Sequence, residues 1–186
     1  MRLIQIAAAV MFATVVATPG IAAPQIEVGA RIPAKFVALD ASGKTRDFAS
    51  IRGRKGAVLV LFRSAKWCPY CQAQLKGLQA AGTLTALAQR GYTLTALSYD
   101  PPAILATFAQ RQGIAFTLLS DEKSAMIDAF GLRDPAYPAD SFAYGVPKAS
   151  ILVIDAKGVV RSKNVAADYK FRPTPEAILA SVDGVK

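Results

Sequence analysis

The amino-acid sequence predicts an α/β sandwich with a mixed central sheet, formed by one domain over about residues 27–186. Three observations lead to this prediction. Strand-like segments alternate with segments of helical periodicity. Residues 57–62 form an unbroken apolar run, which is typical of a strand covered on both faces. The chain then closes with a hairpin pattern and a capped helix, and 186 residues suffice for one well-buried domain.

The first half of the domain begins with a predicted β-hairpin, whose strands at 36–39 and 45–48 flank a glycine-containing turn. After the apolar strand, helical spacing of leucines starts at Cys68 and predicts one or two helices, bent at Gly77 or Gly82. A further strand is expected at 92–98. Asp100 then suits the N-cap of the next helix, with Pro101 at its first position.

The second half continues the same alternation. We expect a strand at 116–119, a short helix at 126–130 and a Pro- and Asp-rich loop at 133–145. The closing hairpin is expected at 150–154 and 159–163. Thr174 and Pro175 are the expected cap and first residue of the last helix.

Residues 1–22 have the layout of a cleaved secretory signal peptide. Arg2 precedes an apolar run of about 15 residues, and small residues allow cleavage after Ala22. The run is shorter than the ~20 residues of a full membrane span, so an uncleaved membrane anchor is the alternative. We therefore expect an exported, periplasmic protein, in a compartment where disulfides persist.

Composition excludes several function classes. The chain has two cysteines and no histidine, so neither a Ser-His-Asp nor a Cys-His nucleophile can be built, and a Cys/His zinc site lacks ligands. We expect no metal and no cofactor. The net charge is +9, but the basic residues are scattered rather than arranged as a stripe with aromatics, so no nucleic-acid partner is expected.

The two cysteines, Cys68 and Cys71, follow the apolar strand after five loop residues and open a helix. Residues three apart at a helix start share a face, so their sulfurs can form a disulfide. Cys68 lies where unpaired amides and the helix dipole stabilise a thiolate, and Pro69 is tolerated there. A structural disulfide across so small a loop adds little stability. A redox-active dithiol is therefore favoured over a structural disulfide, a metal site shared between chains or two inert core cysteines.

This motif, Cys68-Pro69-Tyr70-Cys71, together with Gly145-Val146-Pro147 before a strand, resembles the thioredoxin-like superfamily. The resemblance implies a three-layer thioredoxin-like sandwich, here with an N-terminal β-hairpin extension. It also implies a cis peptide bond before Pro147, facing the cysteines, and a Val146 backbone that pairs with a substrate chain. The implied substrate-binding residues are Trp67, Pro69, Tyr70, Val146 and Pro147.

The closer resemblance is to the AhpC/TSA (redoxin, peroxiredoxin-like) family, over about residues 28–183. It rests on the segments 62–75, 96–100, 118–121, 129–132, 153–161 and 169–173. The peroxiredoxin motif Pro-x-x-x-Thr/Ser-x-x-Cys falls on Ser64, Cys68 and Cys71, so two of its residues are replaced. The family's usual arginine falls near Ala149, with Lys148 beside it.

Two mechanisms follow from the resemblance. In the favoured one, the Cys68 thiolate attacks a disulfide of a protein or small molecule and Cys71 resolves the mixed disulfide; run backwards, the steps oxidise a dithiol. In the alternative, a hydroperoxide oxidises Cys71 and Cys68 resolves the product. Both need a recycling thiol reductase or oxidase. A copper-chaperone role is disfavoured because the chain has no histidine.

Five further residues near the motif or in the tail of the domain are candidates for a role beside the cysteines. Arg63, Lys66 or Lys148 can favour a thiolate electrostatically, but solvated surface charge is the expectation for each. Tyr169 and Arg172, in the tail of the domain, are assigned to surface packing. The position of the buried aspartate of many thioredoxins falls on Phe62.

Overall fold

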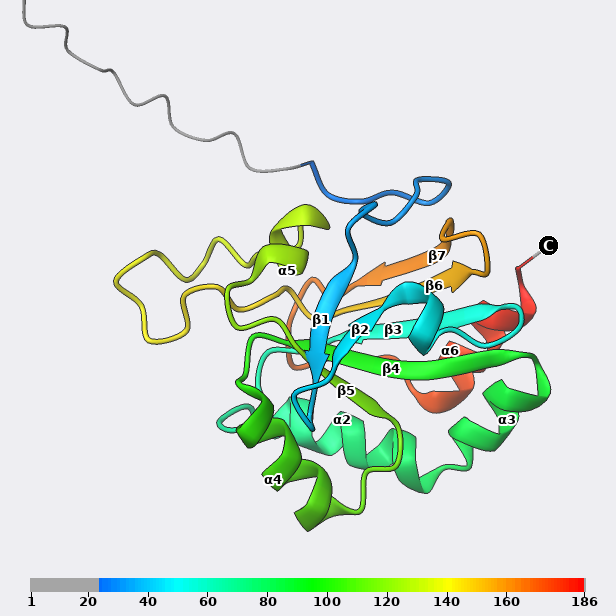
Figure 1. Cartoon of the computed structure of the whole chain (residues 1–186), viewed down its shortest axis with the longest axis horizontal. Helices are drawn as coiled ribbons and strands as arrows, with labels where there is room; N and C mark the ends of the chain where they lie inside the picture. Colours follow the sequence, from blue (N-terminus) through cyan, green and yellow to red (C-terminus); the bar gives the residue numbers. More distant parts are fainter. Residues whose placement is uncertain (1–23, 186) are drawn as a thin grey trace, which may run out of the picture.

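The computed structural model describes residues 24–185, which form a seven-stranded mixed sheet (Figure 1). The strand order is β2-β1-β5-β4-β3-β6-β7. The central strands β3, β4 and β5 are parallel, and the remaining neighbours pair antiparallel. The strands are β1 (Val37–Asp40), β2 (Thr45–Asp47), β3 (Gly56–Leu61), β4 (Tyr92–Ser98), β5 (Thr117–Ser120), β6 (Ser150–Asp155) and β7 (Val160–Val165).

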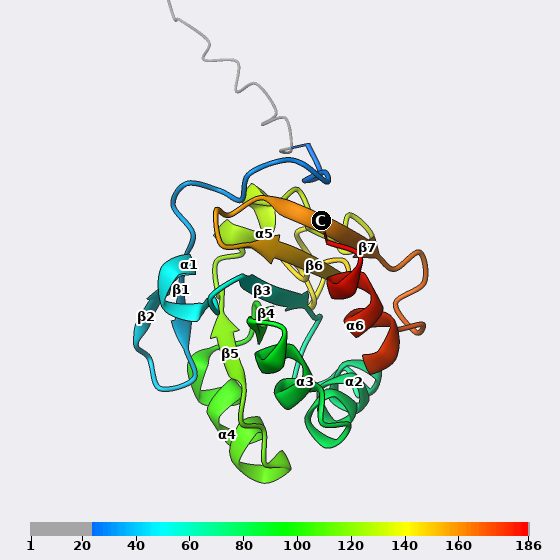
Figure 2. The same ribbon diagram turned by 90° about the vertical axis from the view of Figure 1, so that its right-hand side faces the viewer.

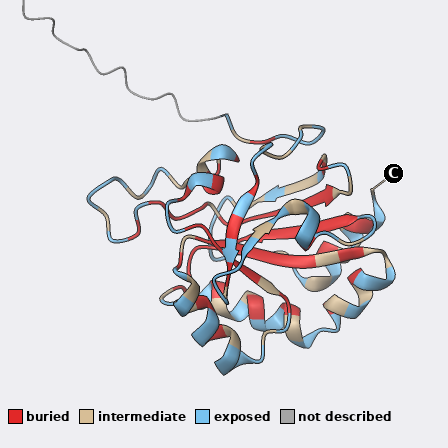
Figure 3. Ribbon diagram, viewed as in Figure 1, coloured by how far each residue is buried: buried red, intermediate tan, exposed pale blue. Residues whose placement is uncertain are grey.

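Helices cover both faces of this sheet (Figure 2). Apolar side chains of α2, α3, α4 and α6 pack on one face, and those of α1 and α5 pack on the other with the segment before β1. The central strands β3, β4, β5 and β6 are mostly buried between these layers, whereas β1, β2 and β7 at the sheet edges are partly exposed (Figure 3). The helices are α1 (Phe48–Ile51), α2 (Pro69–Ala80), α3 (Thr83–Gln89), α4 (Pro102–Gln112), α5 (Ala125–Ala129) and α6 (Pro175–Asp183). The predicted three-layer sandwich and its β1–β2 extension are confirmed.

Element boundaries agree with the sequence within a few residues. Of the two glycines proposed as a bend, Gly82 separates α2 from α3, with a φ of 65° in the left-handed region that favours glycine. Thr174 caps α6 through its hydroxyl, which accepts a hydrogen bond from the Ala177 N–H at 3.3 Å.

The predicted N-cap of α4 is wrong. Pro101 occupies the cap and Pro102 the first position, and no side chain caps this helix. Asp100 is buried instead, and its carboxylate accepts hydrogen bonds from the segment before Cys68. Because Pro101 and Pro102 both suit the first position of a helix, α4 can begin at either. The hydrogen bonds of Asp100 to Ser64 and Ala65 favour the start at Pro102.

The predicted leader, residues 1–22, lies outside the described residues, as does the last residue of the predicted domain. Within residues 24–185, no helix is long and apolar enough to cross a membrane.

The β1–β2 turn gives a first testable prediction, because it is built around Asp40. Its carboxylate accepts hydrogen bonds from the Ser42 hydroxyl at 2.6 Å and from the Arg46 guanidinium at 2.7 Å. Burial acts to raise the pKa of Asp40, but these hydrogen bonds outweigh it and lower the pKa to about 2. A carboxyl group whose pKa is lowered by folding stabilises the fold above its unfolded pKa, and that stability is lost as pH falls. We expect Asp40→Asn to cost about 2 kcal/mol at pH 7.

Urea unfolding at pH 7 and pH 3 measures this cost, which should shrink by about 1 kcal/mol at the lower pH. The exposed Asp140 is the matched control, and Asp140→Asn should leave stability unchanged at both values. A cost that stays constant or grows toward pH 3 would contradict the assignment.

Candidate active site

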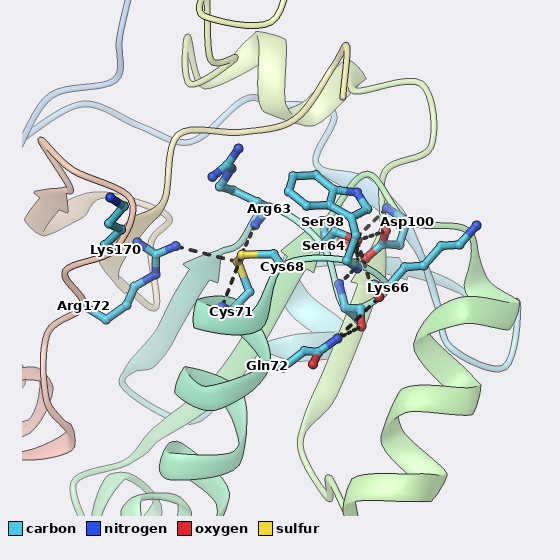
Figure 4. The surroundings of a disulfide bond; sticks show 12 residues. Arg63, Ser64, Lys66, Cys68, Cys71, Gln72, Ser98, Asp100, Lys170 and Arg172 are labelled. Atoms are coloured by element: carbon cyan, nitrogen blue, oxygen red, sulfur yellow. Dashed lines mark hydrogen bonds between the residues drawn. A yellow bond between two sulfur atoms is a disulfide. The ribbon is translucent and has the colours of Figure 1, made fainter. Parts of the chain in front are cut away.

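Cys68 and Cys71 form a disulfide at the start of α2 (Figure 4). Their Cα atoms are 5.3 Å apart. Cys68 is the N-cap residue, and its sulfur accepts a hydrogen bond from the Cys71 N–H at 3.3 Å. Pro69 follows at the first helical position, where no N–H is needed. Cys68 is 1% exposed and Cys71 is 0% exposed, so both sulfurs belong to the core face of the helix.

Two further donors point at the sulfur of Cys71. The Arg63 backbone N–H, two residues after the end of β3, lies 3.3 Å from Sγ. The Arg172 guanidinium, from the segment before α6, places Nη2 at 3.7 Å from the same atom (Figure 4). Burial lowers the pKa of Arg172 to about 10, with repulsion from Arg63 as the second cause, so the group stays charged at neutral pH. The assignment of Arg172 to surface packing is wrong.

Arg63 is 3% exposed and is not the solvated surface charge that the sequence suggested. Three aromatic rings surround its guanidinium carbon, with ring centroids at 5.0 Å for Trp67, 4.9 Å for Tyr137 and 4.0 Å for Tyr169. The guanidinium also hydrogen-bonds the Tyr137 hydroxyl. Contacts between a cation and ring faces partly replace lost hydration. Because the rings come from three segments, this cage also fixes the loop after α5 and the tail against the disulfide.

A buried carboxylate fixes the segment that leads into Cys68. Asp100 is 4% exposed and accepts hydrogen bonds from the Ser64 hydroxyl at 2.8 Å and the Ala65 N–H at 2.6 Å. A third comes from the Ser98 hydroxyl at 3.1 Å. In Figure 4 this cluster lies on the opposite side of the disulfide from Arg172. Asp100 therefore ties the end of β4 to the loop that positions Cys68.

A second prediction concerns this carboxylate. We expect Asp100→Asn to destabilise the fold by about 1–3 kcal/mol at pH 7, because an amide cannot accept all three hydrogen bonds. Burial raises the pKa of Asp100 despite the hydrogen bonds that act to lower it. A raised carboxyl pKa adds stability at low pH that is lost as pH rises through the folded-state value. The cost of the substitution should therefore grow toward pH 4.5 in urea titrations, opposite to the trend for Asp40. A cost that shrinks on acidification would overturn this account.

The predicted substrate-binding rings lie around the motif. The Trp67 indole N–H donates to the Tyr99 hydroxyl at 3.0 Å, and its ring packs edge-on against exposed Phe142 with centroids 5.4 Å apart. Tyr70 is 41% exposed and packs edge-on against Tyr169, with centroids 5.8 Å apart. These contacts place aromatic surface beside the disulfide.

The predicted roles of Val146 and Pro147 are not supported. The described chain contains no cis peptide bond, so the predicted cis bond before Pro147 is wrong. The Val146 N–H donates to the Ala143 carbonyl, and its carbonyl accepts from the Asp134 N–H. Neither backbone group is free for a substrate strand in this structure. Both hydrogen bonds of the Val146 backbone are made within the long loop between α5 and β6, so its N–H and carbonyl are already paired.

The sequence missed three contributors to the site: the guanidiniums of Arg63 and Arg172 and the carboxylate of Asp100. The signal for Arg63 is its position directly after the apolar run 57–62, and the signal for Arg172 is its position in segment 169–173, which resembles the family. Within residues 24–185, no group of three or more acidic or cysteine side chains is placed to hold a metal ion.

A disulfide between residues three apart at a helix start, with a backbone N–H and one guanidinium at its second sulfur, is the arrangement of a thiol-based oxidoreductase. The AhpC/TSA family model matches residues 28–163 of the chain. The protein belongs to the AhpC/TSA family and is a peroxiredoxin-like enzyme.

Similar proteins agree with this assignment. A putative peroxiredoxin of Mycobacterium tuberculosis is 33% identical over 140 residues, which cover 75% of this chain and 86% of the relative. Peroxiredoxin Bcp of Escherichia coli is 30% identical over 148 residues, covering 80% and 90% respectively. Among solved structures, peroxidoxin BcpB of M. tuberculosis matches with a TM-score of 0.73 at 20% identity, covering 87% of this chain and 99% of that one. Reduced Prx3 of Vibrio vulnificus, solved in complex with hydrogen peroxide, matches with a TM-score of 0.71 at 21% identity, covering 85% and 99%. The thioredoxin-like fold is thereby confirmed.

Proposed function

We propose that the protein is a thiol peroxidase in which Cys71 reacts with the hydroperoxide and Cys68 resolves the product. The observation that carries this proposal is the placement of two donors, the Arg63 N–H and the Arg172 guanidinium, on the sulfur of Cys71. A positive group beside a cysteine stabilises the thiolate, which is the reactive species. The site therefore supports the peroxidase alternative better than attack by Cys68.

In the proposed reaction, the Cys71 thiolate attacks the distal oxygen of ROOH. The O–O bond breaks, Cys71 becomes a sulfenic acid, and the alkoxide takes a proton to leave as ROH. The Cys68 thiol then displaces the sulfenic oxygen as water and forms the Cys68–Cys71 disulfide. A thiol reductant supplies two electrons and two protons to restore both thiols. Arg172 would stabilise the thiolate and the developing alkoxide.

The relatives support this proposal through their names, since several are peroxiredoxins and one neighbour was solved with hydrogen peroxide bound. Disulfide exchange with Cys68 as nucleophile is a second candidate. It is favoured by the Cys71 N–H, which donates to the Cys68 sulfur at the N-cap of α2.

The test uses Trp67, the single tryptophan, which adjoins Cys68, and we expect its emission to change when the disulfide forms. Fully reduced protein is mixed rapidly with equimolar hydrogen peroxide, and Trp67 emission and free thiols are followed together. We expect disulfide formation at least about 100-fold faster than oxidation of free cysteine measured alongside, as preorganised donors supply factors of this size. Alkylated protein should show no change. Oxidation no faster than that of free cysteine would reject the peroxidase proposal.

For location, we propose export to the periplasm with removal of residues 1–22. The charged start, apolar run and small residues before Ala23 support this. Intact mass of protein recovered from the periplasmic fraction should correspond to a chain that begins at Ala23. Full-length protein in the membrane fraction would instead indicate an uncleaved anchor.

A further inference from the structure

Positive charge beside the disulfide is poorly neutralised in the oxidised protein. The five ion pairs found within residues 24–185 include neither Arg63 nor Arg172. Both side chains also keep a buried Nε–H without a hydrogen-bond partner. Asp168 offsets the burial of Arg172 and its repulsion from Arg63 only in part. The oxidised state thus retains an electrostatic cost that an anion at the site would relieve.

Reduction of the disulfide creates such an anion. A Cys71 thiolate would find the Arg63 N–H and the Arg172 guanidinium already in place, at 3.3 Å and 3.7 Å from its sulfur. The Cys71 N–H already points at the Cys68 sulfur. Groups that stabilise a thiolate favour the reduced pair over the disulfide, and stabilisation of the reduced form makes a disulfide a stronger oxidant.

We propose that the Cys68–Cys71 disulfide is strongly oxidising, and that the protein passes the oxidising power of hydroperoxides to cysteine pairs in polypeptide chains. Formation of the disulfide by peroxide rests on the proposed function. The oxidising character of the disulfide rests on the charges around it and holds whichever oxidant forms it.

The transfer proceeds by two exchanges. A thiolate of the partner attacks the Cys68 sulfur, the Cys68–Cys71 bond breaks, and Cys71 leaves as a thiolate held by Arg172. A better stabilised thiolate is a better leaving group. The second partner thiol loses its proton and attacks the mixed disulfide, which releases Cys68 as a thiol and the partner as a disulfide. Two electrons and one proton pass to the pair, because the partner enters as one thiolate and one thiol and the pair ends as the Cys71 thiolate and the Cys68 thiol. The proton lost when the first partner thiol ionises protonates the alkoxide, so the net reaction with peroxide yields the partner disulfide, ROH and water.

A polypeptide partner fits the surface at the motif. Tyr70 lies between the cysteines in sequence and is 41% exposed, while Phe142, in contact with Trp67, is 79% exposed. Aromatic side chains of this kind are enriched where proteins bind one another. The disulfide itself is buried, so the partner must displace neighbouring side chains, and a chain that packs on the rings can do so more readily than a small thiol.

The first experiment measures the equilibrium constant of the pair with glutathione, by quantifying free thiols over a range of glutathione redox ratios. We expect Arg172→Gln to shift this constant at least tenfold toward the disulfide, equivalent to about 30 mV. The equilibrium constant of Arg172→Lys, which keeps the charge, should lie between those of the wild type and Arg172→Gln. Arg54→Gln removes an exposed charge at the opposite end of β3 and should match the wild type. Equal constants for wild type and Arg172→Gln would overturn the proposal, with circular dichroism showing that each variant is folded.

The second experiment mixes oxidised protein with a reduced two-cysteine peptide, without peroxide, and then repeats the reaction with catalytic protein and excess hydroperoxide. One peptide disulfide per protein is expected in the first case and continuous turnover in the second. Peptide oxidation without peroxide-driven turnover would refute the peroxidase function and leave the oxidising disulfide supported. Peroxide consumption with a thioredoxin-type reductant, but no peptide oxidation, would refute the inference and leave the peroxidase function supported.

Discussion

Cys71→Ser is expected to lower the rate constant with hydrogen peroxide by roughly 10³-fold or more, because the nucleophile itself is removed. Cys68→Ser should keep a fast first reaction, since the Arg63 N–H and the Arg172 guanidinium both lie at Cys71. Without a resolving thiol the reaction then stops at the Cys71 sulfenic acid. Intact mass after one equivalent of peroxide should show one added oxygen in Cys68→Ser and none in Cys71→Ser.

The same pair of variants separates the two candidate mechanisms. If Cys71→Ser reacts rapidly with peroxide and Cys68→Ser does not, Cys68 is the nucleophile and the assignment from the arginines is wrong. If neither variant reacts with peroxide but Cys71→Ser forms a stable mixed disulfide with a protein disulfide, exchange through Cys68 replaces the peroxidase proposal. Wild-type protein with both thiols alkylated is the control for oxidation elsewhere, including the methionines.

Local sequence patterns were sufficient to predict the strand before the site and the disulfide at its centre. The apolar run over 57–62 predicted a central strand. It did so because a strand covered by helices on both faces needs apolar side chains on both, and β3 is buried in this way. The spacing of Cys68 and Cys71 predicted a disulfide because residues three apart at a helix start face the same way. Each of these signals depends on residues close together in the chain.

The electrostatics of the site depend on contacts that no local pattern carries. Arg172 lies 101 positions after Cys71 and reaches it because the chain returns past the disulfide after β7. Arg63 is one basic residue among 22 Lys and Arg, and its burial follows from rings in three separate segments. Surface assignment was the reasonable expectation for an arginine with no local partner. Only the tertiary fold distinguishes these two from the solvated majority.

The role of Asp100 was mistaken for a related reason. An Asp before a proline is a good helix cap by local preference, and the sequence contains no sign that Ser64 and Ala65 compete for its carboxylate. Family resemblance predicted a cis peptide bond before Pro147, which precedes β6. In this structure that bond is trans, and Pro147 forms a β-bridge with Arg133. Resemblance predicted the fold well, but it did not predict which side chains surround the disulfide.

Arg172→Gln should lower the rate constant of Cys71 with peroxide by about 100-fold, the loss typical when one preorganised charged donor is removed from a reacting oxyanion or thiolate. Arg172→Lys keeps a positive charge but loses the planar guanidinium, so it should recover most of this loss and not all. Rapid mixing with the Trp67 signal measures all three proteins under one set of conditions.

The control separates a local effect of charge from a general one. Arg54→Gln removes the same charge from an exposed position and should leave the rate constant within twofold of wild type. Thiolate absorbance of the reduced proteins at pH 7 gives an independent readout, which should fall in Arg172→Gln and not in Arg54→Gln. A normal rate constant in Arg172→Gln would show that the Arg63 N–H and the helix start suffice to activate Cys71. An equal loss in both variants would mean that overall charge, rather than the guanidinium at 3.7 Å from the sulfur, attracts or activates the peroxide.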